Sequence, residues 1–234
     1  MTLRRILSLG APLLGAAAVG WLVQRWGYSV REQSREVARR PAAPDTPTPQ
    51  GSGAPVQTEA DGEGARFYRR YRVRVADSEL SAESLFARIA EDVDAFVPDE
   101  LARFERTRGT DGQIVPGDEF LVHIRAPWNG PVRVAEASAT HFVLLTLEGH
   151  LEAGSIRFAA RGARGGRLSF EIESWARSAD AVVDLAYDTL GVAAEAQQAT
   201  WTFFCKRVAE ACGGQIVGEI EVLTERDADD EAAA

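Results

Sequence analysis

Cysteine is scarce in this 234-residue chain, which has only two. Cys205 and Cys212 lie in a segment with helical periodicity, where seven residues correspond to about 10 Å along the helix axis. A disulfide requires a Cα separation below about 7 Å, so the two thiols cannot pair within that helix. We expect both to be free cysteines buried among apolar side chains.

The short motifs of metal and nucleotide chemistry are missing. The chain contains no H-E-x-x-H pair, no G-x-S-x-G elbow, no P-loop and no G-x-G-x-x-G stretch. His150 and Glu152 match the H-x-E half of zinc nucleobase deaminases, but the P-C-x-x-C that completes such a site does not follow. We therefore expect neither a bound metal nor a cofactor.

Basic residues are too few to give the chain a positive charge, and the formal net charge is −9. The arginines near the N-terminus make the remainder still more acidic. Binding to a nucleic-acid backbone requires a basic face, so we expect no nucleic-acid partner. The acidic end, residues 225–231, is typical of a solvated, disordered tail.

Charged residues are entirely missing from Ile6 to Gln24, a run long enough to cross a bilayer as a helix. Trp21 and Trp26 lie near its end, where aromatic rings favour the membrane interface. A cleaved signal peptide is the alternative, but the sequence after the run offers a poor cleavage site. The sequence predicts a single-pass membrane protein with the membrane as partner through residues 6–24. Five arginines after the run favour a cytoplasmic domain.

The composition divides the chain into four parts. Residues 1–29 are predicted to be the transmembrane anchor, and residues 30–64 a linker that is first basic and then rich in Pro, Gly and Ser. Mixed Glu and Arg from Val30 to Arg40 predict a short helical extension at the start of this linker. Residues 65–214 form the expected globular domain, and residues 215–234 an edge strand near 216–223 followed by the tail. We expect the residues before about Gly64 to be dispensable for folding.

Periodicity within the domain predicts an α+β fold. Residues 67–75 alternate as a half-exposed strand does, Ser81 caps a short helix, and Pro98 begins a second short helix that runs to Phe104. Five short alternating runs then predict an antiparallel meander, namely 120–124, 132–134, 141–145, 156–159 and 168–172. A long apolar stripe from Val183 to Val208 predicts a C-terminal helix that covers the sheet.

Candidate site residues cluster in the turn-like segment 146–154, where His150 and Glu152 would share a face of extended backbone. One interpretation makes His150 an acid or base oriented by Glu152; the other is a hairpin whose side chains bond to the loop. Further aromatic and polar residues would meet across a helix-covered sheet, as small-molecule sites require. These additional candidates are Trp128, Asn129, Glu173, Trp175, Arg177, Gln197 and Trp201.

Several ordered stretches together resemble an uncharacterised bacterial family with a domain of unknown function, DUF1990. They are FERTRG (104–109), GDEF (117–120), PWNGPVRV (127–134), TLEGHLEAG (146–154) and IESWARS (172–178), followed by AEAQQ (194–198) and Trp201. The resemblance covers about Arg66 to Gly214. It implies a helix-grip fold like that of START domains and polyketide cyclases: a curved antiparallel sheet of about six or seven strands, two short helices and one long C-terminal helix on the concave face. Many members have proline where this chain has Leu151.

Three functional hypotheses follow from these features. The first is a membrane-tethered domain that binds an apolar or amphipathic, lipid-like small molecule between the sheet and the long helix. The second is a cyclase- or hydrolase-like enzyme that uses His150 and Glu152, and the third is a structural or interaction domain with a filled core. The missing catalytic motifs favour the first hypothesis over the second.

Overall fold

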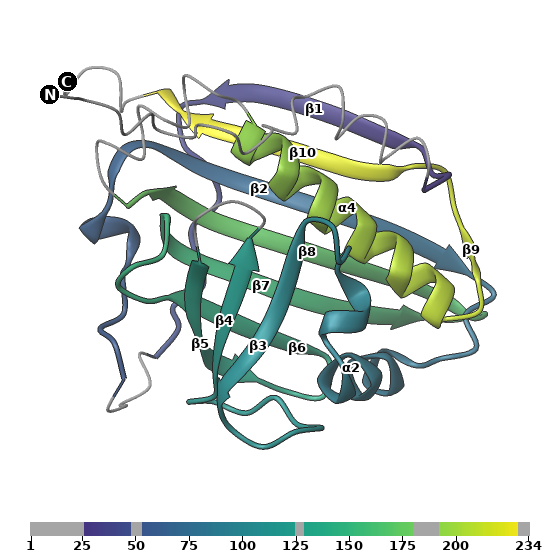
Figure 1. The fold of residues 1–234 in the computed structure, drawn as a ribbon. Coiled ribbons are helices and arrows are strands. Elements are labelled where there is room, and N and C mark those ends of the chain that lie inside the picture. Colours follow the sequence, from purple (N-terminus) through teal and green to yellow (C-terminus); the bar gives the residue numbers. More distant parts are fainter. Residues whose placement is uncertain (1–25, 48–52, 125–128, 180–191, 229–234) are drawn as a thin grey trace, which may run out of the picture.

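The computed structural model describes residues 26–47, 53–124, 129–179 and 192–228. The fold is α+β, with a large curved sheet and the helix α4 laid across it (Figure 1). The described helices are α2 (Ala82–Glu91) and α4 (Val192–Ala211), with short 3-10 turns η1 (Glu59–Asp61) and η2 (Asp94–Phe96). The strands are β1 (Val30–Val37), β2 (Glu63–Ala76), β3 (Ala102–Arg108), β4 (Glu119–Ile124), β5 (Asn129–Ala137), β6 (His141–Thr146), β7 (Glu152–Ala163), β8 (Arg167–Ser178), β9 (Gln215–Ile216) and β10 (Ile220–Asp227).

The strands form one sheet in the order β1-β10-β2-β8-β7-β6-β5-β4-β3, with the short β9 paired to the end of β2. Neighbours are antiparallel except β1 and β10, which run parallel. The strands from β3 to β8 follow one another as an antiparallel meander, of which β4 to β8 are the strands that the sequence predicts. β2 precedes this region in the sequence and β10 follows it, and the two strands extend the sheet beyond β8.

Side-chain alternation gives the sheet two different faces. Tyr71, Val73 and Val75 of β2 point to the face that α4 covers, called the inner face, and are almost fully buried. The arginines between them point to the outer face and pair with acidic residues of β8 and β10; Arg72, for example, lies 3.6 Å from Glu171. This alternation explains why β2 reads as a half-exposed strand in the sequence.

Aromatic rings fill much of the space between α4 and the inner face. Phe204 of α4 has no exposed surface and stacks on Phe170 of β8, with ring centroids 5.6 Å apart. It also contacts Phe158 of β7 and Phe96 of η2, at 5.4 and 5.3 Å. Burying a large aromatic side chain contributes about 1.5–3 kcal/mol, so this cluster is a main stabilising element. Both cysteines are free and buried here, as predicted.

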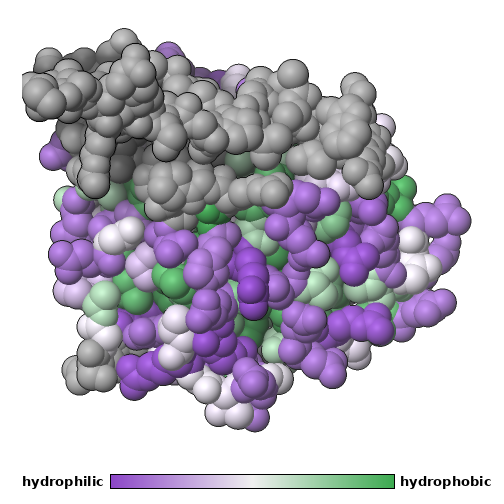
Figure 2. Space-filling view, viewed as in Figure 1, coloured by the Kyte–Doolittle hydropathy of each residue, from purple (hydrophilic) through white to green (hydrophobic). Residues whose placement is uncertain are grey.

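The start of α2 and the end of α4 lie where the sequence signals place them. The Ser81 hydroxyl accepts a hydrogen bond from the Ser84 amide at 3.2 Å and caps α2. α4 ends just before Gly213, whose φ of 65° lies in the left-handed region that favours glycine. The predicted residues 183–190 of the long helix lie outside the described residues. Hydrophilic residues cover much of the visible surface (Figure 2), and only Val115 and Val217 are exposed large hydrophobic residues in the described ranges.

The strand count corrects the sequence prediction, because the sheet has ten strands rather than six or seven. The edge strand expected near 216–223 overlaps β9 and the first half of β10, but β10 lies between β1 and β2 rather than at the edge. The second short helix predicted from Pro98 to Phe104 is wrong, because Ala102 to Arg108 form β3. Ala102 and Phe104 are buried and Arg103 and Glu105 exposed, which is the two-residue period of a strand.

The helical extension predicted from Val30 to Arg40 is also wrong, since Val30–Val37 is β1. Its six central residues are exposed, so no apolar alternation marks the strand in the sequence. The predicted disordered tail is corrected at its start, because Glu225 belongs to β10, is only 5% exposed and accepts a hydrogen bond from Arg35 at 2.9 Å. Residues 229–234 lie outside the described residues.

Other parts of the predicted linker also pack on the domain. The Pro41 carbonyl accepts a hydrogen bond from Trp175 Nε1 at 3.1 Å on the outer face. Residues 55–57 run beside the turn between β6 and β7, where Val56 forms a bridge with Leu147. A linker is therefore the wrong description for these segments. The domain boundary near residue 65 stays a prediction.

The prediction of a single-pass membrane protein, with a cytoplasmic domain, is corrected. Within the described ranges no helix has both the length and the apolar composition that a bilayer crossing needs. The predicted segment itself, residues 6–24, lies outside the described residues.

Two truncated chains test the boundary, one beginning at Gly53 and the other at Ala65. Both lack β1, so their difference isolates residues 53–64. We expect both to unfold cooperatively in urea, with the shorter chain less stable by about 2–4 kcal/mol, because it loses the hydrogen bonds that Gln57 makes to the β6–β7 turn. Aggregation of the shorter chain alone would show that the domain begins before residue 65.

Candidate functional site

A buried ion pair lies on the inner face near the N-terminal half of α4. Arg69 of β2 and Glu152 of β7 are 8% and 9% exposed, and Arg69 Nη1 lies 3.2 Å from Glu152 Oε1. Gln197 of α4 donates from Nε2 to Glu152 Oε2 at 2.8 Å. One carboxylate therefore joins two strands and the helix that covers them.

Three buried polar atoms near this ion pair have no hydrogen-bond partner among the described residues. They are Ser174 Oγ, Gln197 Oε1 and Trp201 Nε1. Ser174 is 4% exposed and is the register partner of Arg69 on one side and of Ile156 on the other. Burying a polar group without a hydrogen bond costs about 1–3 kcal/mol in proteins, so three together need an explanation. We call Arg69, Glu152, Ser174, Gln197 and Trp201 the inner polar cluster.

His150 lies in the turn that precedes β7, beside this cluster. Its Nδ1 is 2.9 Å from the Glu152 amide nitrogen and 3.0 Å from the Glu152 carbonyl oxygen. Burial lowers the pKa of the His150 imidazole below its ordinary value, although the nearby Glu152 carboxylate acts in the opposite direction. The ring lies against the backbone of Gly130, where a Cβ atom would come within 2.6 Å of it. A larger residue at position 130 would therefore require the imidazole ring to shift.

Backbone and side-chain hydrogen bonds hold the turn in place. The side-chain amide of Gln57 donates to the carbonyls of His150 and Glu152, both at 3.2 Å. The buried Thr146 hydroxyl donates to the Gln57 carbonyl at 2.8 Å and accepts from the Gly154 amide at 2.9 Å. These contacts fix the position at which Glu152 enters the inner face.

The other predicted site residues are divided between the two faces of the sheet. Glu173 and Trp175 point to the outer face, where the Tyr68 hydroxyl donates to Glu173 at 2.8 Å and the Tyr68 ring lies 5.4 Å from that of Trp175. Arg177 has the same strand parity and donates to the Gly64 carbonyl. The structure therefore separates these three residues from Gln197 and Trp201, which the sequence analysis had placed opposite them.

Asn129 contacts a different partner, the half-buried His123 of β4, with 3.1 Å between Asn129 Oδ1 and His123 Nδ1. Trp128 lies outside the described residues. Sequence reasoning missed Arg69 and Ser174. The sequence could have identified Arg69, because this residue has the same strand parity as Tyr71, Val73 and Val75. An arginine at that position lies on an apolar face, which is unusual.

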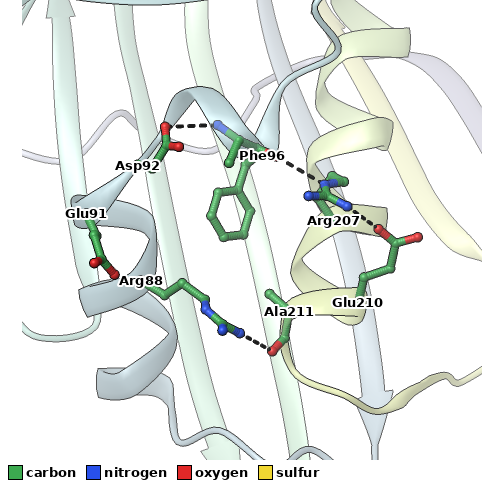
Figure 3. Close-up of a pocket in the computed structure, with 8 residues that line it drawn as sticks. Arg88, Glu91, Asp92, Phe96, Arg207, Glu210 and Ala211 are labelled. Atoms are coloured by element: carbon green, nitrogen blue, oxygen red, sulfur yellow. Dashed lines mark hydrogen bonds and ion pairs between the residues drawn. The ribbon is translucent and has the colours of Figure 1, made fainter.

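Two adjoining grooves lie outside the core, on the flank of the C-terminal half of α4. The first, of about 430 Å³, lies between α2, η2 and α4, with Phe96 at its base (Figure 3). The second, of about 490 Å³, shares Ala95 and Arg207 with it. Arg207 donates to the Ala95 carbonyl at 3.0 Å and Arg88 to the Ala211 carbonyl at 2.9 Å. These side chains tie the helices together, so the two arginines of the first groove already have partners.

The fold is of the α+β class: a helix lies over a large, mainly antiparallel sheet, and polar groups are buried between them. The family model described as a domain of unknown function, DUF1990, matches residues 54–209. This match covers more than half of the chain, and the chain belongs to the DUF1990 family. A comparison with curated protein sequences gave no match.

Solved structures resemble the chain only distantly. A conserved protein from Geobacillus kaustophilus has 10% identity and a TM-score of 0.43, over 64% of this chain and 99% of that one. Norcoclaurine synthase from Thalictrum flavum, in complex with dopamine and hydroxybenzaldehyde, has 12% identity and a TM-score of 0.42, over 64% and 94%. The di-domain ARO/CYC StfQ of the steffimycin biosynthetic pathway has 14% identity and a TM-score of 0.44, over 66% and 51%.

The Gln197→Leu substitution tests the bond between α4 and Glu152. Leucine has a similar volume but cannot donate to the buried carboxylate, and hydrogen bonds to charged groups contribute about 1.5–3 kcal/mol. We expect the free energy of unfolding to fall by about that amount in urea denaturation. Gln198→Leu is the matched control, since Gln198 bonds to Glu32 at an exposed position and should change stability by less than about 0.5 kcal/mol. Equal losses would contradict the assigned geometry.

The lowered pKa of His150 makes stability depend on pH. The unfolded chain takes up a proton on this imidazole near pH 6.5, whereas the folded protein does so only at lower pH. The contribution of His150 is therefore fully present above pH 6.5 and is lost as the pH falls towards the folded pKa, at no more than about 1.4 kcal/mol per pH unit. We expect His150→Gln to flatten the stability profile between about pH 6.5 and 5.

The comparison requires urea denaturation of both proteins across that pH range. Above about pH 8 the histidine is neutral in both states, so the two profiles should run parallel there. Parallel profiles throughout the acidic range as well would show that folding leaves the imidazole pKa unchanged.

Proposed function

We propose that this protein binds a small amphipathic molecule between the N-terminal half of α4 and the inner face of the sheet. The inner polar cluster carries this proposal. It combines a buried ion pair with three buried polar atoms that lack partners in the part of the chain that the structure describes, and a ligand that bonds to them would remove the cost of their burial. A few directed polar groups in an otherwise apolar interior are the usual form of a small-molecule site.

Apolar side chains border the polar cluster and would contact the rest of the ligand. Trp201 lies edge-on to Phe158, with ring centroids 5.5 Å apart. Ile156 points to the same face of β7 as Phe158 and Glu152, because the three residues share strand parity. Both Trp201 and Ile156 are only partly buried, so they have surface left that a ligand can cover.

The aromatic cluster limits where such a molecule fits. Phe158 and Phe170 each pack directly on Phe204 beneath the C-terminal half of α4. A ligand that extended into this half would have to displace close-packed rings, which is costly. We therefore place the binding site at the end of the interior that contains Gln197 and Trp201.

An enzyme that uses His150 with Glu152 has less support. The Glu152 carboxylate is engaged by Arg69 and Gln197, and the histidine Nδ1 contacts the Glu152 backbone rather than its carboxylate. A general base needs its imidazole within reach of the proton that it removes and a partner that orients it. The packing of this ring against Gly130 favours a structural role in the turn.

Native mass spectrometry of the protein purified from its own host tests the proposal. We expect a copurified small molecule that is depleted in Ser174→Val, because the valine side chain brings an extra methyl group and no hydroxyl to the cluster. Ser169→Val is the matched control: Ser169 lies on the same strand but points to the outer face. Melting temperatures establish that both variants fold.

Two results would contradict the proposal. The first is an unmodified protein that carries no copurified molecule and gains none when incubated with a lipid and metabolite extract of the host. This result would favour a domain with a filled core. The second is equal retention in the two serine variants, which would place the ligand away from the inner polar cluster.

A further inference from the structure

We infer that the ligand group held by the inner polar cluster is an uncharged hydroxyl, which both donates and accepts hydrogen bonds, and not a carboxylate or phosphate. This inference rests on the proposed function and specifies its ligand. The evidence is the set of hydrogen-bonding roles that Ser174, Gln197 and Trp201 leave unfilled.

The orientation of the Gln197 amide follows from its partner. A carboxylate can only accept hydrogen bonds, so the amide group that faces Glu152 Oε2 at 2.8 Å must be the NH₂. The amide oxygen then points away from Glu152, and it is one of the buried atoms without a partner among the described residues. It needs a group that donates a hydrogen bond, and a ligand hydroxyl can supply one.

The two other atoms require different partners. Trp201 Nε1 carries a hydrogen and can only donate, so it needs a ligand atom that accepts. The Ser174 hydroxyl can donate or accept. The cluster therefore presents one acceptor, one donor and one group that takes either role. A hydroxyl group complements this set, because its hydrogen can bond to Gln197 Oε1 while its oxygen accepts from Trp201 or Ser174.

The charges of the cluster argue against an anionic ligand. Arg69 and Glu152 are oppositely charged, nine-tenths buried and in contact, so their charges offset each other. An added carboxylate would place a second negative charge near Glu152 in a buried region, where like charges interact strongly. It would also direct acceptor oxygens at Gln197 Oε1, which would leave that atom without a donor.

The first groove beside α4 differs from the inner polar cluster in a way that supports the choice of the cluster as the binding site. There Arg88 and Arg207 donate to backbone carbonyls, and Arg207 also pairs with Glu210 at 2.7 Å. The donors of the groove thus have acceptors within the protein itself. In the inner polar cluster an acceptor and a donor remain open one helical turn apart on α4, at Gln197 and Trp201.

Three probes built on a ten-carbon chain test the inference on the complete protein: 1-decanol, decyl methyl ether and sodium decanoate. The alcohol donates and accepts, the ether only accepts, and the carboxylate only accepts and is charged. Titrations are followed by tryptophan fluorescence and checked by isothermal calorimetry. We expect 1-decanol to bind roughly tenfold more tightly than the ether, since one hydrogen bond to a buried acceptor is lost, and at least as much more tightly than decanoate.

Two variants assign the preference to the cluster. Gln197→Leu removes the open acceptor, so the alcohol and the ether should bind equally well. Trp201→Phe removes the donor but keeps an aromatic ring, so both probes should weaken by a similar factor while the preference for the alcohol remains. Gln198→Leu, on the neighbouring position of α4, should leave all three affinities unchanged. If Gln197→Leu does not fold, Trp201→Phe and the three probes still decide the question.

The outcomes separate this inference from the proposed function. Tighter binding of decanoate than of 1-decanol would overturn the uncharged hydroxyl but leave a small-molecule site in place. Equal affinities for the alcohol and the ether in the unmodified protein would also overturn it, and would indicate that a water molecule satisfies Gln197 Oε1. If no probe binds, the inference fails, and the copurified molecule in the mass spectrum decides separately whether the protein binds a ligand at all.

Discussion

The carboxylate of Glu152 is the point at which the main parts of the interior meet. Arg69 reaches it from β2, Gln197 reaches it from α4, and the residue itself begins β7 directly after the His150 turn. A buried ion pair adds little net stability by itself, because both charges must leave water. Its geometry is nonetheless demanding, since a displaced partner leaves a buried charge poorly compensated. The ion pair holds the carboxylate in place, and the hydrogen bond from Gln197 to that carboxylate positions the N-terminal half of α4 over the sheet.

This constraint gives the two halves of the interior different properties. Under the C-terminal half of α4, Phe204 and its aromatic neighbours pack as an ordinary core, and their contacts need no specific direction. Under the N-terminal half, the contacts are directional hydrogen bonds, and several buried polar atoms there have no hydrogen-bond partner among the described residues. A single helix thus provides both the packed core and the polar site, with Trp201 lying between the two.

Much of the fold could be predicted from the sequence because most of its elements have one apolar and one polar face. The alternation in β2, the serine cap of α2 and the meander from β4 to β8 all carry local signals. β1 and β3 were missed for physical reasons. β1 is exposed along most of its length and so lacks apolar alternation, and the start of β3 lies after a proline that also favours a helix.

The candidate site was less accessible to sequence reasoning. Glu152 was identified from the unusual turn that also holds His150, and Gln197 and Trp201 from the apolar stripe of the long helix. Glu173, Trp175 and Arg177 were assigned to the same space although they point to the outer face. The face of a strand depends on its register with its neighbours, and a shift of one residue reverses every side chain. Ser174 shows the same effect. Between two large residues that attract attention, the small hydroxyl is the one that points inward.

The charged sequence of β1 has a consequence for the behaviour of the protein at high concentration. β1 is the last described strand on its side of the sheet, and such an edge can pair with the same edge of a second molecule. Symmetric antiparallel pairing centred on Gln33 would bring Arg31 opposite Arg35, and pairing centred on Ser34 would bring Glu32 opposite Glu36. Like charges directly opposite each other destabilise strand pairs. The arginines and glutamates of β1 remove the apolar alternation by which a strand is predicted from sequence. The same residues therefore oppose the growth of the sheet into aggregates.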